Sequence, residues 1–198
     1  MKPYGLRSLT KGAFLYLCVM LTHNRKLTPS DTQAYRAIRL ECLKNFPGNF
    51  SSTFEDESKK PKLAFEIYIE EQGPDAFMMG AFDNEKLVGI CGFFREQKVK
   101  CRHVGNIIQM YVQPEYAGKG VGQGLLGATI TESLKNQEIE QLTLGVVTSN
   151  KAANKLYEKL GFKEYGVHKG QFKNGDQYAD QRFMVLCRDT QPQPKGRG

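Results

Sequence analysis

Residues 106–122, with the sequence NIIQMYVQPEYAGKGVG, decide the fold of this chain. Residues 106–112 predict a strand, residues 116–122 a glycine-rich loop, and residues 123 onward a helix. Glycines allow successive backbone N–H groups to point at one spot, where a helix N-terminus adds about half a positive charge. The stretch therefore predicts a strand–loop–helix cradle for a phosphate or pyrophosphate. The simpler alternative is a plain tight turn.

The spacing inside this loop excludes two common nucleotide-binding motifs. A Walker A loop needs Ser or Thr directly after its lysine, whereas Gly120 follows Lys119. A dinucleotide pattern GxGxxG can be placed on residues 122–127, but those glycines fall inside the predicted helix rather than in the turn after the strand. We therefore expect neither a P-loop nor a Rossmann-type site.

The remaining sequence predicts one domain of the α/β (α+β) class. Strands are expected at residues 21–27, 76–82, 86–95, 101–112, 139–147, 162–168 and 178–187. Helices are expected at residues 29–45 and 61–73, after the glycine loop, and at residues 150–160. Residues 51–60 are expected to form a polar loop. No repeat or linker divides these elements.

Charge and composition exclude several classes of function. The chain has 198 residues, of which 40% are hydrophobic, so it can bury a sizeable core. Its net charge of +7 lies at residues 1–26 and 188–198, while the body is neutral, which argues against nucleic-acid binding. Five cysteines without a CxxC pair and three histidines without metal spacing predict no metal site. Residues 188–198 are expected to be a solvated tail.

The first 26 residues form an extension with two interpretations. The apolar run at residues 12–21, GAFLYLCVML, follows three basic residues and imitates a secretory signal. Residues 21–24 lack the small side chains of a cleavage site, and ten helical residues span only about half of a bilayer. The alternative is that Met20 is the true start. We expect reduced thiols and a cytoplasmic protein without a membrane anchor.

A second motif lies downstream, where residues 150–162 read NKAANKLYEKLGF. Taken alone, this segment predicts a helix that is capped by Asn150, carries an apolar stripe and ends at Gly161. Together with residues 117–122, AGKGVG, it resembles the GNAT superfamily of acyl-CoA-dependent N-acetyltransferases. The family patterns are NxxAxxLYxxxGF and a Gln or Arg followed by xxGxG or xxGxA. Ala117 replaces that Gln or Arg, and Lys119 is a candidate for the missing charge.

The resemblance covers residues 27–187 and implies the GNAT fold, a mixed and mostly antiparallel sheet of about seven strands flanked by helices. It also implies acetyl-CoA as co-substrate. Asn150 would hold the cofactor arm or a water, although a simple helix cap explains it as well. The residues implied for cofactor binding are Met110, Tyr111, Val112, Gly118, Lys119, Gly120, Val121, Gly122, Asn150 and Tyr157.

Acetyl transfer needs a neutral amine, donors for the developing oxyanion and a proton for the departing thiolate. The resemblance implies Tyr157 as the acid and a backbone N–H near Met110 as the oxyanion donor, on a strand that is splayed from its neighbour. The general base stays open between Glu115, which is near in sequence, and a water chain. Asn106 and Gln109 occupy the stretch where some members of the family have a glutamate.

The expected acceptor is a primary amine on a small molecule, a peptide or a protein. The family lines its acceptor cleft from the first two helices and the last strands, which makes Glu41, Tyr178 and Asp180 the candidate contacts. The leading hypothesis is an N-acetyltransferase. The alternative is a non-catalytic acyl-CoA-binding module on the same fold, against which Tyr157 argues. A homodimer is left open as its assembly.

Overall fold

The computed structural model describes residues 22–188. The apolar run at residues 12–21, the alternative start at Met20 and the tail from residue 189 lie outside the described residues. The strands, in chain order, are β1 (Thr22–Lys26), β2 (Ala76–Asp83), β3 (Lys86–Arg95), β4 (Val104–Val112), β5 (Gln141–Val147), β6 (Lys163–Asn174) and β7 (Gln177–Cys187). The helices are α1 (Thr32–Asn45), α2 (Phe54–Ser58), α3 (Ala64–Glu71), α4 (Val121–Ser133) and α5 (Lys151–Lys159).

All seven strands form one sheet in the order β1-β2-β3-β4-β5-β7-β6, as expected for a mixed, mostly antiparallel sheet. Among the strands of residues 22–188, only β4 and β5 pair in parallel, and every other neighbouring pair is antiparallel. The predicted opening strand is present as β1, so the sheet begins before residue 27. No helix within residues 22–188 is long and apolar enough to cross a membrane.

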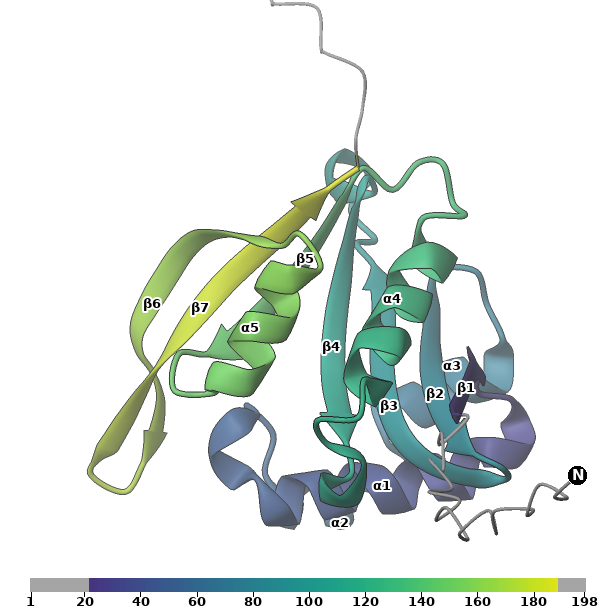
Figure 1. Ribbon diagram of the computed structural model, residues 1–198, viewed down its shortest axis with the longest axis horizontal. Coiled ribbons are helices and arrows are strands. Elements are labelled where there is room, and N and C mark those ends of the chain that lie inside the picture. Colours follow the sequence, from purple (N-terminus) through teal and green to yellow (C-terminus); the bar gives the residue numbers. More distant parts are fainter. Residues whose placement is uncertain (1–21, 189–198) are drawn as a thin grey trace, which may run out of the picture.

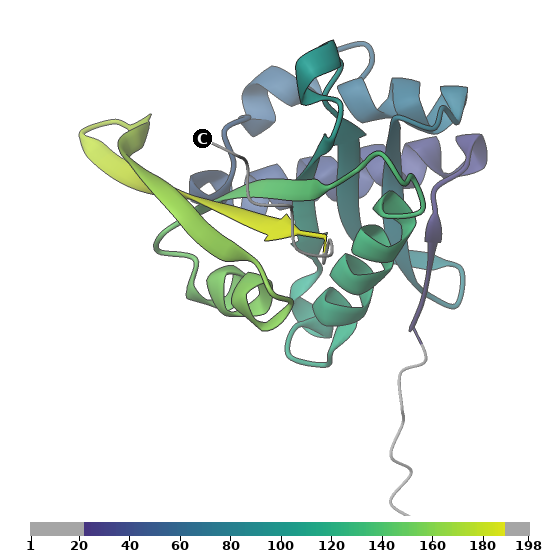
Figure 2. The same cartoon turned by 90° about the horizontal axis from the view of Figure 1, so that it is seen from above.

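Helices cover both faces of the sheet (Figures 1 and 2). Helices α1 and α3 pack on one face, where Tyr35, Ile38 and Ile69 are buried against the strands. Helices α4 and α5 pack on the other face, where Leu125 and Tyr157 belong to a second buried cluster. The β6–β7 hairpin extends away from the rest of the molecule (Figure 1). The sheet is thus buried on both faces through its centre, which holds β4 and its loop in place.

The structure differs from the sequence prediction between the first two helices. Residues 51–60 were expected to be a loop, but α2 forms there because the Thr53 hydroxyl accepts a hydrogen bond from the Asp56 N–H at 3.1 Å. Helix α3 starts at Ala64 rather than at Pro61, because the Glu66 carboxylate accepts the Leu63 N–H at 2.6 Å. Both differences come from local caps that hydrophobic periodicity does not detect.

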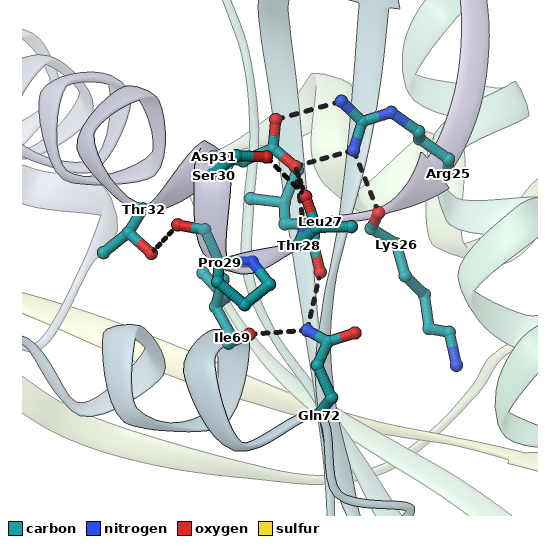
Figure 3. Close-up of polar contacts among 10 residues, drawn as sticks. All are labelled: Arg25, Lys26, Leu27, Thr28, Pro29, Ser30, Asp31, Thr32, Ile69 and Gln72. Carbon is teal, nitrogen blue, oxygen red and sulfur yellow. Dashed lines mark hydrogen bonds and ion pairs between the residues drawn. The ribbon is translucent and has the colours of Figure 1, made fainter.

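Polar contacts at the start of α1 fix this helix to the edge of the sheet (Figure 3). The Arg25 guanidinium donates to both oxygens of the Asp31 carboxylate, at 2.6 and 2.9 Å. The same carboxylate accepts the Thr28 N–H at 2.8 Å. On the other side, the Gln72 amide donates to the Leu27 carbonyl at 2.9 Å. The direction of α1 is therefore set before the helix crosses the sheet.

This junction predicts a pH-dependent contribution to stability. Arg25, followed by the Thr28 hydrogen bonds, lowers the pKa of Asp31 to about 2. A lowered folded-state pKa gives stabilisation that is complete above the unfolded pKa of about 3.9 and is lost as the pH falls toward about 2. We expect Asp31→Asn to lower the melting temperature by about 1–3 °C at neutral pH. The difference from wild type should shrink between about pH 4 and pH 2.

Melting curves followed by circular dichroism across this pH range test the prediction. Asp176→Asn, in the exposed turn of the β6–β7 hairpin, is the matched control and should leave the melting temperature unchanged. A difference between Asp31→Asn and wild type that stays constant from neutral to acidic pH would contradict the assignment.

Candidate active site

Strands β4 and β5 separate halfway along their length, and this separation creates the site. They pair only at Val104–Gln141, Gly105–Leu142 and Asn106–Thr143. Beyond the last of these pairs β4 continues to Val112 and β5 to Val147 without pairing with each other. In Figure 1 the two strands meet at the top and diverge downward. The expected splay is therefore present, and it leaves facing strand edges between which an extended chain can bind.

A bulge in β4 lies beside the splay. The pairing of β3 with β4 shifts register between Ile90 and Gly92, because β4 carries one extra residue there. Gln109 lies at this bulge with φ of 52°, a conformation that non-glycine residues rarely adopt. The Tyr35 hydroxyl of α1 donates to the Gln109 side-chain carbonyl at 2.9 Å. The bulge turns the following residue, Met110, into the region between the strands.

A large cavity of about 580 Å³ runs along the glycine loop and α5. Gly118 and Gly120 have φ of 73° and 83°, and an added Cβ at either position would meet open space. The loop thus uses glycine for its backbone conformation, directly before the N-terminus of α4. The cavity is lined by Phe46, Asn49, Phe50, Met110, Tyr111, Val112, Tyr116, Ala117, Gly118, Gly120, Gly122, Gln123, Asn150, Ala152, Ala153, Lys155, Leu156 and Lys159.

A small cavity of about 280 Å³ occupies the gap between the splayed strands. It shares Asn49, Phe50, Met110, Asn150 and Ala153 with the large cavity. Its other walls come from α1, the segment before α2, the unpaired parts of β4 and β5, helix α5 and the last hairpin: Arg39, Ser51, Ser52, Ile107, Ile108, Gln109, Gly145, Val146, Val147, Tyr157, Phe172 and Gln181. The two cavities therefore adjoin along these five shared residues, one of which is Met110.

Tyr157 reaches the small cavity from α5. Only 6% of its surface is exposed, and its ring packs edge-on against Phe162. Burial, with a smaller effect from Cys91, raises the pKa of the Tyr157 phenol above its usual value. Like an ordinary phenol, whose pKa is about 10, the Tyr157 side chain carries its proton at neutral pH.

Asn150 is the N-cap residue of α5. Its side-chain carbonyl accepts the Ala153 N–H at 3.1 Å, which caps α5. The neighbouring Asn154 amide donates to the Val147 carbonyl at 3.1 Å, which ties the start of α5 to the end of β5. Asn150 also lines both cavities, so the cap lies at their junction.

Comparisons with known proteins place this geometry in a family. The sequence model of the Acetyltransferase (GNAT) family matches residues 37–162. The chain belongs to this family. It is accordingly an acetyltransferase, as the two sequence motifs indicated. The expected sheet of seven strands is also confirmed.

Two curated relatives and one solved structure are similar to this GNAT acetyltransferase. It is 29% identical to an N-alpha-acetyltransferase of Saccharolobus solfataricus, over 73% of this chain and 81% of the relative. It is 28% identical to a spermidine N(1)-acetyltransferase of Thermoplasma acidophilum, over 70% and 86%. The fold matches yncA of Salmonella typhimurium, solved with its cofactor acetyl-CoA, with a TM-score of 0.72 at 20% identity, over 88% and 98% of the two chains.

The structure brings together most of the residues that the sequence predicted for this acetyltransferase. Tyr157 lines the small cavity, and Met110 and Asn150 line both cavities. Five further predicted residues line the large cavity: Tyr111, Val112, Gly118, Gly120 and Gly122. Two residues of the loop region do not: Val121 is buried in the core beneath α4, and the Lys119 amine lies 5.7 Å from the centre of the Tyr116 ring.

Besides Lys119 and Val121, four more predicted residues lie outside both cavities. Glu115 is exposed in the turn before the glycine loop. Glu41 accepts hydrogen bonds from the Tyr111 hydroxyl and the Gln113 amide, each at 2.8 Å. On the last hairpin, Tyr178 is 65% exposed, and Asp180 binds the Lys169 amine and the Gly170 N–H, each at 2.8 Å. Glu115 therefore does not lie at the candidate active site, and Glu41, Tyr178 and Asp180 line neither cavity.

Sequence reasoning missed Arg39, Gln181, Lys155 and Lys159. Arg39 could have been found, because it lies four residues after Tyr35 on the buried stripe of α1, where a charge is unusual. Gln181 could not have been found from the sequence. Its side chain lies so close to Gly145 of β5 that a Cβ at position 145 would overlap it. That approach depends on the pairing of β5 with β7, which the local sequence does not specify.

The glycine loop gives a prediction about stability. Gly120 precedes α4 with φ of 83° and has open space around it, so Gly120→Ala introduces backbone strain without a clash. We expect it to lower the free energy of unfolding by about 1–2 kcal/mol. Gly127→Ala is the matched control, because Gly127 lies inside α4 with ordinary helical backbone and open space. That variant should raise the free energy of unfolding by about 0.5–1 kcal/mol. Urea unfolding measures both, and equal effects of the two variants would refute the prediction.

Proposed function

We propose that this GNAT acetyltransferase transfers the acetyl group of acetyl-CoA to the primary amine of a small molecule or a peptide. The observation that carries the proposal is that the two cavities adjoin beside the gap between β4 and β5, where they share wall residues that include Met110. One cavity begins at an anion cradle, and the other ends among polar side chains. A cofactor and an acceptor entering from opposite sides would meet at this junction.

The residues of the large cavity fit the phosphates and the arm of acetyl-CoA. Gly118 and Gly120, which have no Cβ to obstruct a ligand, together with the N-terminus of α4, favour a pyrophosphate. Lys155 and Lys159, four residues apart on α5, add positive charge to the same cavity and stand in for the Arg or Gln that Ala117 replaces. The unpaired edge of β4 from Met110 to Val112 can bind an amide-containing arm as an added strand does.

At the junction, the chain offers the groups that acetyl transfer needs. Acetyl-CoA supplies a thioester carbonyl that the amine attacks. The backbone N–H near Met110 would stabilise the negative charge on the carbonyl oxygen, and the Tyr157 phenol would give its proton to the departing sulfur. The position of Tyr157 on the wall of the small cavity supports this role, and a phenol, with an ordinary pKa of about 10, is protonated before the step.

No carboxylate lines the small cavity within the described part of the chain. The amine must lose its proton to another acceptor, and a water chain along the polar walls is the route we propose. Ser51, Ser52 and Gln181 provide hydroxyl and amide groups on those walls. The similar proteins carry the names N-alpha-acetyltransferase and spermidine N(1)-acetyltransferase, which supports an amine acceptor.

The acid role is tested by Tyr157→Phe. Release of the CoA thiol is followed in the presence of acetyl-CoA and a panel of amino acids, peptides and polyamines. We expect the variant to lose about 10²- to 10⁴-fold in kcat, with KM for acetyl-CoA unchanged, because the phenol acts in the transition state. Tyr165→Phe, which removes a hydroxyl from a ring that is 60% exposed on β6, should retain full activity. A Tyr157→Phe enzyme with wild-type kcat would overturn the acid role.

The lysines of α5 give a separate prediction for cofactor binding. We expect Lys155→Met and Lys159→Met each to weaken CoA binding about two- to fivefold, since an exposed charge pair contributes about 0.5–1 kcal/mol. The effect should shrink at high salt, because exposed charges are screened. Lys151→Met, on the same helix but outside the cavity, is the control. Calorimetric titration with CoA measures all three, and equal affinities at low salt would exclude both lysines from the phosphate contacts.

A further inference from the structure

Arg39 is a buried positive charge that lines the small cavity. Only 3% of its surface is exposed, although it carries a full charge. Its contacts are the Cys42 sulfur, at 3.7 Å from one terminal nitrogen, and the face of the Phe50 ring, at 5.1 Å from the guanidinium carbon. Its Nε is buried and has no hydrogen-bond partner. Within the described residues, no carboxylate forms an ion pair with Arg39.

Three carboxylates on α1 and on the helices α2 and α3 that contact it are bound elsewhere. Glu66 accepts from Arg36 at 3.1 Å and from the Leu63 N–H at 2.6 Å. Glu57 pairs with Lys60 at 2.9 Å. Glu41 is held by Tyr111 and Gln113. None of these three lines the small cavity, so its described walls hold one positive charge and no negative charge.

An uncompensated buried charge is costly, and arginine cannot escape the cost by losing its proton. A negatively charged group of a bound ligand would pair with Arg39 and offset this cost. The phosphates that we assign to acetyl-CoA lie in the large cavity, which Arg39 does not line, and an acetyl group carries no charge. The missing anion must therefore come from the other molecule in the small cavity.

We propose that Arg39 binds a carboxylate on the acceptor, so that the substrate is a primary amine that also carries a carboxylate. This inference rests on the proposed function and names its substrate class. A guanidinium presents two parallel donors that match a carboxylate, and the Arg39 guanidinium also contacts the face of the Phe50 ring. The Ser51 and Ser52 hydroxyls line the same cavity and can donate to the carboxylate as well. The carboxylate is the α-carboxylate of a free amino acid or the side chain of an acidic first residue in a peptide.

The same walls disfavour a polyamine acceptor. A polyamine brings further positive charges, and the described walls of the small cavity offer no carboxylate to pair with them. Like charges at short range in a partly dry site repel one another. The acceptor that suits Arg39 is therefore acidic rather than basic.

Matched acceptors test the inference by thiol release. L-alanine is compared with L-alaninamide, L-phenylalanine with L-phenylalaninamide, and peptides that begin with Asp or Glu with those that begin with Asn or Gln. In the wild type we expect the acids to be used at least about tenfold better in kcat/KM within at least one matched set, as for a charged hydrogen bond. Arg39→Met should remove this preference by slowing the acids alone, and Arg39→Lys should restore part of it.

Arg36→Met is the matched control. Arg36 lies three residues before Arg39 on α1, pairs with Glu66 and does not line the cavity, so the preference should survive. Because Arg39→Met removes an unpaired buried charge, it should melt no earlier than wild type, which separates a binding effect from unfolding. The inference is overturned if amides and acids are used equally by the wild type, or if Arg39→Met slows every acceptor alike. It is also overturned if the wild type prefers succinyl-CoA to acetyl-CoA and Arg39→Met loses that preference, because the carboxylate then belongs to the acyl chain.

A binding measurement keeps this inference separate from the proposed function. The protein, saturated with CoA, is titrated calorimetrically with N-acetyl-L-alanine, N-acetyl-L-aspartate and their neutral amides. Tighter binding of the carboxylates that Arg39→Met abolishes supports the inference even if no acceptor releases thiol, in which case only the proposed function fails. Equal binding of acids and amides, or no binding of either, overturns the inference even if acetyl transfer is observed.

Discussion

The contact between Asn106 and Thr143 determines where β4 and β5 part, and the active site depends on that point. The Thr143 hydroxyl donates to the Asn106 side-chain carbonyl at 2.9 Å, and the Asn106 amide donates to Glu96 at 2.9 Å. These side-chain bonds hold the last backbone pair of the two strands together. Past it, backbone groups that would otherwise satisfy one another face a cavity, where water or a ligand must pair with them.

Several independent features keep the gap open. The bulge at Gln109 shifts the register of β4 against β3. The hydrogen bond from the Tyr35 hydroxyl holds Gln109 in its strained backbone conformation. On the other side, β5 remains fully paired with β7, so it cannot swing back toward β4 without breaking seven residue pairs. Helix α5 is tied to the end of β5 through Asn154. The pairing of the strands thus fixes the shape of the small cavity. Tyr157 lies on a helix that is packed in the core, and not on a loop, so its position is fixed as well.

The sequence predicted the candidate site well where one continuous segment contains both the secondary-structure elements and the functional residues. The strand, the glycine loop and α4 follow one another, so residues 106–122 specify most of the large cavity. The segment at residues 150–162 likewise specifies α5 and Tyr157. The small cavity was less predictable, because Arg39, Ser51 and Gln181 come from α1, the segment before α2 and β7. Only the sheet order brings these residues together, and a single sequence does not encode that order in any local pattern.

The position of Arg39 also bears on the absence of a glutamate in the central strand. A carboxylate beside the amine would hold it as an ammonium ion, which cannot attack a thioester. Pairing with Arg39 cancels the pKa-raising effect of the acceptor's own carboxylate on its amine, and a partly dry cavity also lowers the pKa of a nearby amine. An acceptor whose own carboxylate is held by Arg39 would therefore present its amine closer to the neutral form. The chain then needs only a path for the proton to reach water. Asn106 and Gln109 need not act as a base, and their side chains instead hold β4 in place through hydrogen bonds with Thr143 and Tyr35.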